Sequence, residues 1–100
     1  MATGSATFAY HSTLTASTVD VVTLSRGTVF VEVYNRAAAG GADIYVTTGS
    51  SASPTVGGND CYIITPQSSD TLPTYRLQGS DSNVVRLISS GTPAYSVISR

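Results

Sequence analysis

The sequence has no lysine and no tryptophan, and it contains one cysteine, one histidine and one methionine. Without lysine, five arginines are the only permanently cationic side chains against six acidic residues, and the formal net charge is -1. Such a chain has no basic patch that could follow a phosphate backbone or an anionic membrane surface. We therefore expect neither nucleic acid nor a membrane among its partners.

The single cysteine excludes an intrachain disulfide, and one cysteine with one histidine is too few for a structural zinc site. The apolar neighbours of Cys61, residues 62–64, predict a buried and unreactive strand thiol. The acidic residues lack the spacing of a calcium loop. We expect no metal and no cofactor.

Catalysis by a serine nucleophile needs a neighbouring base, and the only histidine, His11, is not accompanied by a G-x-S-x-G motif. Four of the six acidic residues lie in or beside predicted turns, where such side chains usually bond their own backbone. Glu32 lies mid-strand, where it either faces solvent or pairs with an arginine across a strand or subunit boundary. We expect a protein without enzymatic activity, in which His11 is a solvated strand residue.

No apolar run approaches the roughly 18 residues of a membrane span, and the first residues lack the basic and apolar regions of a signal peptide. This pattern predicts a protein that is made and assembled in a cytoplasm. The apolar fraction of 41% and the low charge predict a folded chain, and 100 residues correspond to one domain, residues 1–100. Serine and threonine make up 29 of the residues, so hydroxyl groups must cover much of the surface.

Apolar residues recur at period two in short runs separated by Gly, Pro, Ser and Asn/Asp clusters, which is typical of strands. The predicted strands lie near Ala6–Leu14, Thr18–Leu24, Thr28–Tyr34, Asp43–Thr48, Asp60–Thr65, Thr71–Leu77, Asn83–Ser89 and Ala94–Ser99. Residues 1–13 form either an N-terminal arm or the first strand. The alternation predicts a core that contains Val29, Val31, Val33, Ile44, Val46, Val85, Leu87 and Val97.

About eight short strands without a helix predict an all-β fold. We expect a single-domain antiparallel β-sandwich, immunoglobulin-like or jelly-roll-like, with a small barrel as the variant. Pro66 and Pro73 should lie at edges or ends of strands, because proline cannot donate to a hydrogen-bonded ladder.

Six tyrosines and two phenylalanines supply all the aromatic side chains. A tyrosine has an apolar ring and a polar tip, which suits half-wet contacts between proteins. The residues that we assign to a protein interface are Phe8, Tyr10, His11, Arg36 and Tyr95.

Three segments carry a resemblance to a known group: VEVYNR at 31–36, IYVT at 44–47 leading to PTVGGNDCY at 54–62, and VRLISSGTPAYSV at 85–97. Together they resemble small proteins encoded among the virion structural genes of tailed phages that infect actinobacteria, which are taken as capsid decoration or minor structural proteins. The resemblance covers roughly residues 14–98. It consists of turn and strand signatures and implies no active-site residues.

The resemblance implies a virion protein that binds the outside of the capsid and stabilises it, after assembly in the cytoplasm of the host bacterium. Its partners would be the major capsid protein of the same phage and copies of itself in a small cyclic oligomer, a trimer or a dimer. One alternative is a tail or tail-tip subunit. Another is a carbohydrate-binding β-sandwich module, although the absence of tryptophan argues against it. We expect the contacts to come from residues 2–11 and the loops, and a chain without residues 2–10 to remain folded.

Overall fold

The computed structural model describes residues 3–6, 8–24, 30–48, 53–59, 61–73 and 84–99. The described residues form strands, turns and bends but no helix, and hence no helix that could span a membrane. The strands are β1 (Thr3–Ala6), β2 (Ala9–Thr13), β3 (Asp20–Leu24), β4 (Phe30–Asn35), β5 (Ile44–Thr48), β6 (Tyr62–Ile64), β7 (Ser68–Pro73), β8 (Val84–Ser89) and β9 (Ala94–Ser99).

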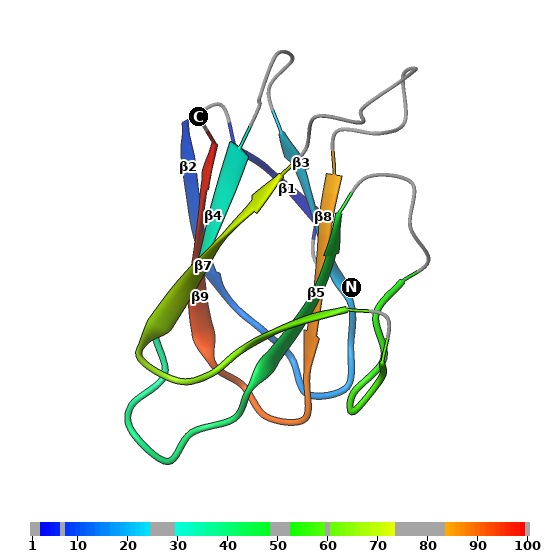
Figure 1. Ribbon diagram of the computed structural model, residues 1–100, viewed down its shortest axis with the longest axis vertical. Coiled ribbons are helices and arrows are strands. Elements are labelled where there is room, and N and C mark those ends of the chain that lie inside the picture. The colour runs from blue at the N-terminus through cyan, green and yellow to red at the C-terminus, as the bar shows by residue number, and fades with distance from the viewer. Residues whose placement is uncertain are drawn as a thin grey trace.

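The strands form two sheets that lie face to face (Figure 1). The five-stranded sheet has the order β1-β3-β8-β5-β6, and the four-stranded sheet has the order β2-β9-β4-β7. All neighbouring strands are antiparallel except β1 and β3, which are parallel. Both sheets keep open edges, so the fold is a sandwich and the barrel variant is not formed.

The connectivity is that of a jelly roll with one added strand. If β1 is set aside and β2 is counted as the first strand, the four-stranded sheet has the strand order 1-8-3-6. The other sheet then has the strand order 2-7-4-5. This arrangement of two interlocked Greek keys distinguishes a jelly roll from the immunoglobulin-like alternative. The added strand, β1, extends the five-stranded sheet beyond β3.

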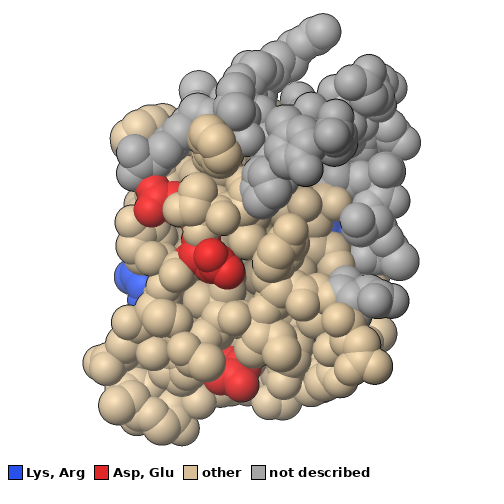
Figure 2. Space-filling view, viewed as in Figure 1, with Lys and Arg blue, Asp and Glu red and all other residues tan. Residues whose placement is uncertain are grey.

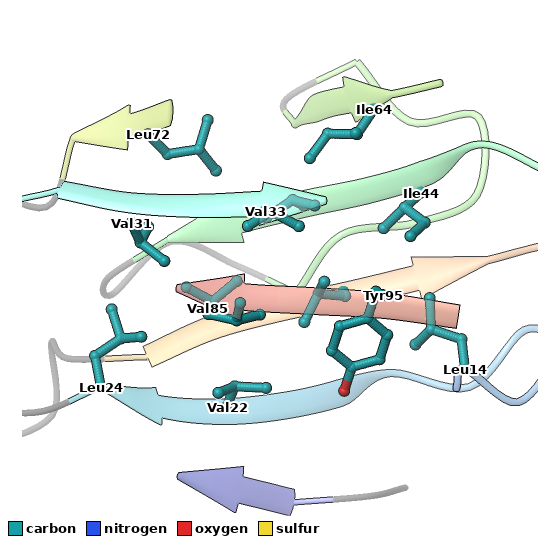
Figure 3. Close-up of a cluster of buried hydrophobic side chains, with 13 residues drawn as sticks. Leu14, Val22, Leu24, Val31, Val33, Ile44, Ile64, Leu72, Val85 and Tyr95 are labelled. Atoms are coloured by element: carbon teal, nitrogen blue, oxygen red, sulfur yellow. The ribbon is translucent and has the colours of Figure 1, made fainter. Parts of the chain in front are cut away.

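The core lies between the sheets and is built from alternate residues of each strand (Figure 3). Seven of the eight predicted core residues have no exposed surface; they are Val31, Val33, Ile44, Val46, Val85, Leu87 and Val97. The eighth, Val29, lies outside the described residues. Burial of one such side chain contributes roughly 1.5–3 kcal/mol, so this alternation is the main source of stability.

The predicted strand boundaries fail in two places. The seventh strand begins at Ser68 and not at Thr71, because β7 is an edge strand whose polar residues face solvent. Its predicted end, Leu77, lies outside the described residues. The first predicted strand, Ala6–Leu14, corresponds to β2, which begins only at Ala9 after a bend at Phe8, and the strand β1 before it was not predicted. Pro73 ends the edge strand β7 and Pro66 follows the edge strand β6, as the sequence predicts.

The described residues before Leu14 belong to the sandwich and do not form a separate arm. β1 pairs with β3 in one sheet, and β2 pairs with β9 in the other. The Tyr10 ring packs against the core and against Gly4, where any side-chain carbon would collide with that ring. The described part of this segment therefore contributes one strand to each sheet.

Two buried polar residues, Asn35 and Ser89, form hydrogen bonds with the connections at the lower end of the molecule in Figure 1. Asn35 Nδ2 donates hydrogen bonds to the carbonyl oxygens of Ala42 and Ile64, both at 2.9 Å, and Asn35 Oδ1 accepts one from the Ala37 N–H at 3.0 Å. The carbonyl oxygen of Asn35 accepts a further bond from Gln67 N–H at 2.9 Å. Asn35 thus holds two connections in place: residues 36–43, between β4 and β5, and residues 65–67, between β6 and β7.

Ser89 performs the same task for the other connections at that end. Its Oγ donates to the carbonyl oxygen of Asp43 at 2.7 Å and accepts from Gly91 N–H at 3.2 Å. Its carbonyl oxygen accepts from Ser17 N–H at 2.8 Å. Ser17 and Gln67 both have positive φ angles, 56° and 62°, so these hydrogen bonds offset the cost of a backbone conformation that non-glycine residues rarely adopt.

Candidate protein interface

The outer face of the four-stranded sheet contains one of the candidate contact residues, His11, and two others, Phe8 and Arg36, lie beside the ends of its strands. The register assigns alternate residues of each strand to this face, opposite to the core residues. Its described members are Ala9, His11, Thr13, Phe30, Glu32, Tyr34, Ser69, Thr71, Ala94, Ser96 and Ile98.

Two hydrogen bonds fix polar side chains on this face. His11 Nδ1 and Ser96 Oγ are 2.7 Å apart on the paired strands β2 and β9. Tyr34 Oη donates to Glu32 Oε2 at 3.2 Å along β4. These polar groups therefore bond within the face, which orders their side chains.

The His11–Ser96 pair has the residue types of a nucleophilic dyad but not its surroundings. Ser96 is only 5% exposed, so a substrate has little access to its hydroxyl. The backbone of Ser96 takes part in the ladder between β9 and β4, whereas an oxyanion site needs free N–H groups beside the nucleophile. This geometry suits a structural cross-strand pair and agrees with the prediction that His11 is an exposed strand residue.

Two exposed phenylalanines lie at the end of the four-stranded sheet where β4 begins. Phe30 is 49% exposed there. Phe8, 69% exposed, precedes β2, and its carbonyl oxygen accepts a hydrogen bond from Ser99 N–H at 2.8 Å. Since Ser99 also pairs with Val31, Phe8 and Phe30 lie at the same end of the sheet on either side of β9. Exposed aromatic rings of this kind are typical anchors of protein contacts.

Arg36 lies at the opposite end of the same sheet, directly after β4. Its side chain is exposed, and its Nη2 donates to the carbonyl oxygen of Tyr95 at 3.4 Å. Three of the five residues assigned to an interface, Phe8, His11 and Arg36, are therefore at the surface around one sheet.

The other two residues of that assignment point inward. Tyr95 has no exposed surface, so its predicted place at an interface is wrong. Tyr10 is half-buried, and its ring centroid is 6.3 Å from that of Tyr95. The physical reason is the parity of β9: Tyr95 shares its side of the strand with the core residue Val97.

The polar partner of Tyr95 is a residue that no pattern in the sequence indicates. Tyr95 Oη donates a 2.9 Å hydrogen bond to Asp20 Oδ2, and Asp20 is itself only 1% exposed. Burial, together with this hydrogen bond and the nearby carboxylate charge, raises the pKa of the Tyr95 hydroxyl far above its ordinary value. The pair cross-links the two sheets and shows no exposure to a ligand.

A second exposed apolar surface lies at the β6 edge of the five-stranded sheet. Ile63 is 52% exposed and Tyr62 is 41% exposed. Cys61, directly before β6, is half-buried and its Sγ is 3.5 Å from the carbonyl oxygen of Gly58. The prediction that Cys61 is fully buried within a strand is therefore wrong, because the strand begins one residue later.

Charged side chains are isolated spots on the side of the molecule seen in Figure 2, and most of the described surface there is uncharged. In the described part of the chain, no three histidine, cysteine, aspartate or glutamate residues gather as a metal site would require. No family model, no characterised protein and no solved structure matches this chain. A function for this protein can therefore be inferred only from its own residues and its sequence motifs.

Proposed function

We propose that this protein is a virion structural subunit of a tailed phage that binds the outside of the capsid and stabilises it. The surface that would contact the major capsid protein is the outer face of the four-stranded sheet. The proposal combines the resemblance of segments 31–36, 44–62 and 85–97 with the character of this face.

The observation that carries the proposal is a continuous sheet face with few charges and aromatic side chains at its border. Its ionisable side chains are few, Glu32 and Tyr34 are bonded to each other, and Phe30 and Phe8 are exposed at one end. Protein interfaces are depleted in charge at their centre and enriched in aromatic residues. A face backed by a fully packed core also loses little conformational entropy on binding.

Mass action supplies the mechanism of stabilisation. A subunit that binds only the assembled shell lowers the free energy of that shell by RT ln(1 + [L]/Kd) for each occupied site. Many copies on one particle multiply the effect. No catalytic step is needed.

The low charge of the face predicts that binding resists salt. Electrostatic steering is screened over a Debye length of about 10 Å at 0.1 M salt, whereas burial of apolar surface is not. Occupancy of the shells should change little between low and moderately high ionic strength. A steep loss of binding with salt would point to charged contacts elsewhere on the molecule.

The experiment is co-sedimentation of purified protein with undecorated shells of the phage that encodes it. Phe30→Ala and Tyr34→Ala should each weaken binding by about tenfold or more, because aromatic anchors contribute on the order of 2 kcal/mol at an interface. The matched control is Thr23→Ala, which alters an exposed residue on the outer face of the other sheet. Its binding should equal that of the unmodified chain.

Each result has a distinct meaning. If the unmodified chain does not bind the shells, the decoration function is wrong. A second outcome is that Phe30→Ala and Tyr34→Ala bind the shells normally and Ile63→Ala does not bind. The β6 edge would then contact the shell, and the assignment of the outer face would be wrong. Quantitative gels of whole virions separate decoration from a tail role, since decoration requires many more copies for each particle.

A further inference from the structure

Among the strands that the structure describes, β2 pairs only with β9, so the other edge of its backbone has no strand partner. Leu14 N–H donates to the carbonyl oxygen of Pro93, and Ser99 N–H donates to that of Phe8, both in the ladder between β2 and β9. In an antiparallel pair, hydrogen-bonded positions alternate with positions whose N–H and C=O groups point the other way. The backbone groups of Ala9, His11 and Thr13 therefore point away from β9.

This edge is accessible and has none of the usual features that prevent strand pairing. His11 and Thr13 are exposed, Ala9 is half-buried, and no hydrogen bond to their outward backbone groups exists within the described residues. β2 contains no proline, lysine, arginine, aspartate or glutamate. Natural proteins use such residues to block exposed strand edges.

Two of the other three edge strands, β7 and β6, are less suited to pairing. β7 contains Asp70 and ends at Pro73, which lacks an N–H donor. β6 has only three residues and is followed closely by Pro66. Short strands, charges and prolines are the features that normally keep an edge unpaired.

We propose that a second copy of this chain pairs along β2, antiparallel, with the two-fold axis at His11. The three residues whose backbone groups point away from β9 are Ala9, His11 and Thr13, and they are symmetric about His11. In the dimer, Ala9 therefore faces Thr13 of the second copy, and the two His11 residues face each other. In that register every outward N–H of one copy meets a carbonyl oxygen of the other, and a two-fold interface must be self-complementary in this way.

Such pairing joins two four-stranded sheets into one continuous sheet, and it places their outer faces side by side. Two docking faces in one particle raise the avidity for a surface of repeated subunits without a new contact. The pairing itself follows from the backbone of β2 and does not depend on what the outer face binds.

The test measures the mass of the purified chain by analytical ultracentrifugation from micromolar to near-millimolar concentration. The unmodified chain should form a dimer in a concentration-dependent way. Ala9→Lys combined with Thr13→Lys should raise the dimer dissociation constant by about tenfold or more, because like charges would then face each other across the axis. Ala9→Lys combined with Thr13→Glu should restore the dimer, since each new lysine would face a new glutamate.

Thr23→Lys is the matched control, because it adds one charge to an exposed position on the other sheet. Circular dichroism and thermal unfolding establish that each variant is folded. Amide hydrogen exchange gives a second measurement: the N–H groups of Ala9, His11 and Thr13 should exchange more slowly as the concentration rises. The proposal is overturned if the unmodified chain stays monomeric, if the two double variants associate equally, or if these three amides are indifferent to concentration.

Discussion

The two faces of the four-stranded sheet use neighbouring residues of the same strands for different tasks. Along β4, Val31 and Val33 have no exposed surface, whereas Phe30 is 49% exposed and Tyr34 lies half-buried on the outer face. Along β9, Tyr95 points into the core while Ile98 points outward. Since side chains alternate along a strand, neighbouring residues lie on opposite faces, so that one packs in the core and the next lies on the outer face.

Inward and outward residues should therefore respond differently to substitution, and experiments can test this difference. Substitutions of inward residues should lower the free energy of unfolding, and substitutions of outward residues should leave it nearly unchanged while altering contacts with partners. The expected effects are largest where whole strands are removed and smallest where one exposed side chain is shortened.

Removal of residues 1–10 should have the largest effect. The deletion takes away β1, the first half of β2 and the Tyr10 ring that packs against the core. The sequence alone predicts that such a chain stays folded, but because these strands belong to both sheets we now expect a chain without a cooperative thermal transition, which circular dichroism would detect. Phe8→Ser is the control, because Phe8 is 69% exposed and its loss should leave the transition intact. A sharp transition in the truncated chain would show that the inward residues of β2 are dispensable.

Asn35→Ala should have the next largest effect, because one buried amide holds two connections. The change leaves the carbonyl oxygens of Ala42 and Ile64 and the N–H of Ala37 without this partner. An unsatisfied buried polar group costs about 1–3 kcal/mol, so we expect a loss of about 3 kcal/mol or more in the free energy of unfolding, measured with urea. Its exposed neighbour provides the comparison: Arg36→Ala should cost under about 1 kcal/mol. Equal losses would refute the role of Asn35.

Tyr95→Phe should cost about 2 kcal/mol, the usual range for a hydrogen bond to a carboxylate. The hydroxyl is neutral in the folded state, and burial with the Asp20 contact raises its folded pKa above its value in the unfolded chain, which is 10.0 for the free group. The unfolded chain therefore loses this proton first as the pH rises, and stability should fall above pH about 10. Urea unfolding across that range should show a smaller fall for Tyr95→Phe than for the outer-face control Tyr34→Phe.

The period-two alternation was sufficient to predict the class of fold and the core. Branched apolar residues at alternate positions, as in Val31 and Val33, need no distant partner to indicate which side is buried. The same parity places Tyr95 on the side of Val97, so the position of a tyrosine in its strand, and not its polar tip, decides whether it is buried. The jelly-roll order of strands required the register, which a single sequence does not contain.

Buried polar residues could not be predicted in the same way. Asp20 is buried because Tyr95, 75 residues away in the chain, brings a hydroxyl to it. Asn35 is buried because Ile64, 29 residues away, presents a carbonyl oxygen. Burial of such groups depends on partners that only the assembled fold supplies. The polar edge strand β7 was misplaced for a related reason, since its Ser68-Ser69-Asp70 start has no apolar alternation.

The smallest expected effect belongs to an outward residue that still makes a hydrogen bond. His11→Ala removes the 2.7 Å contact between Nδ1 and Ser96 Oγ. The imidazole is exposed, so water replaces the lost partner and the free energy of unfolding should change by under about 1 kcal/mol. The inward neighbour Tyr10→Ala should cost several times more, because its ring packs against the core. A double-mutant cycle of His11→Ala with Ser96→Ala measures the interaction free energy between the two side chains. An interaction free energy above about 2 kcal/mol would mean that this outer-face contact stabilises the sheet as strongly as contacts on the inner face do.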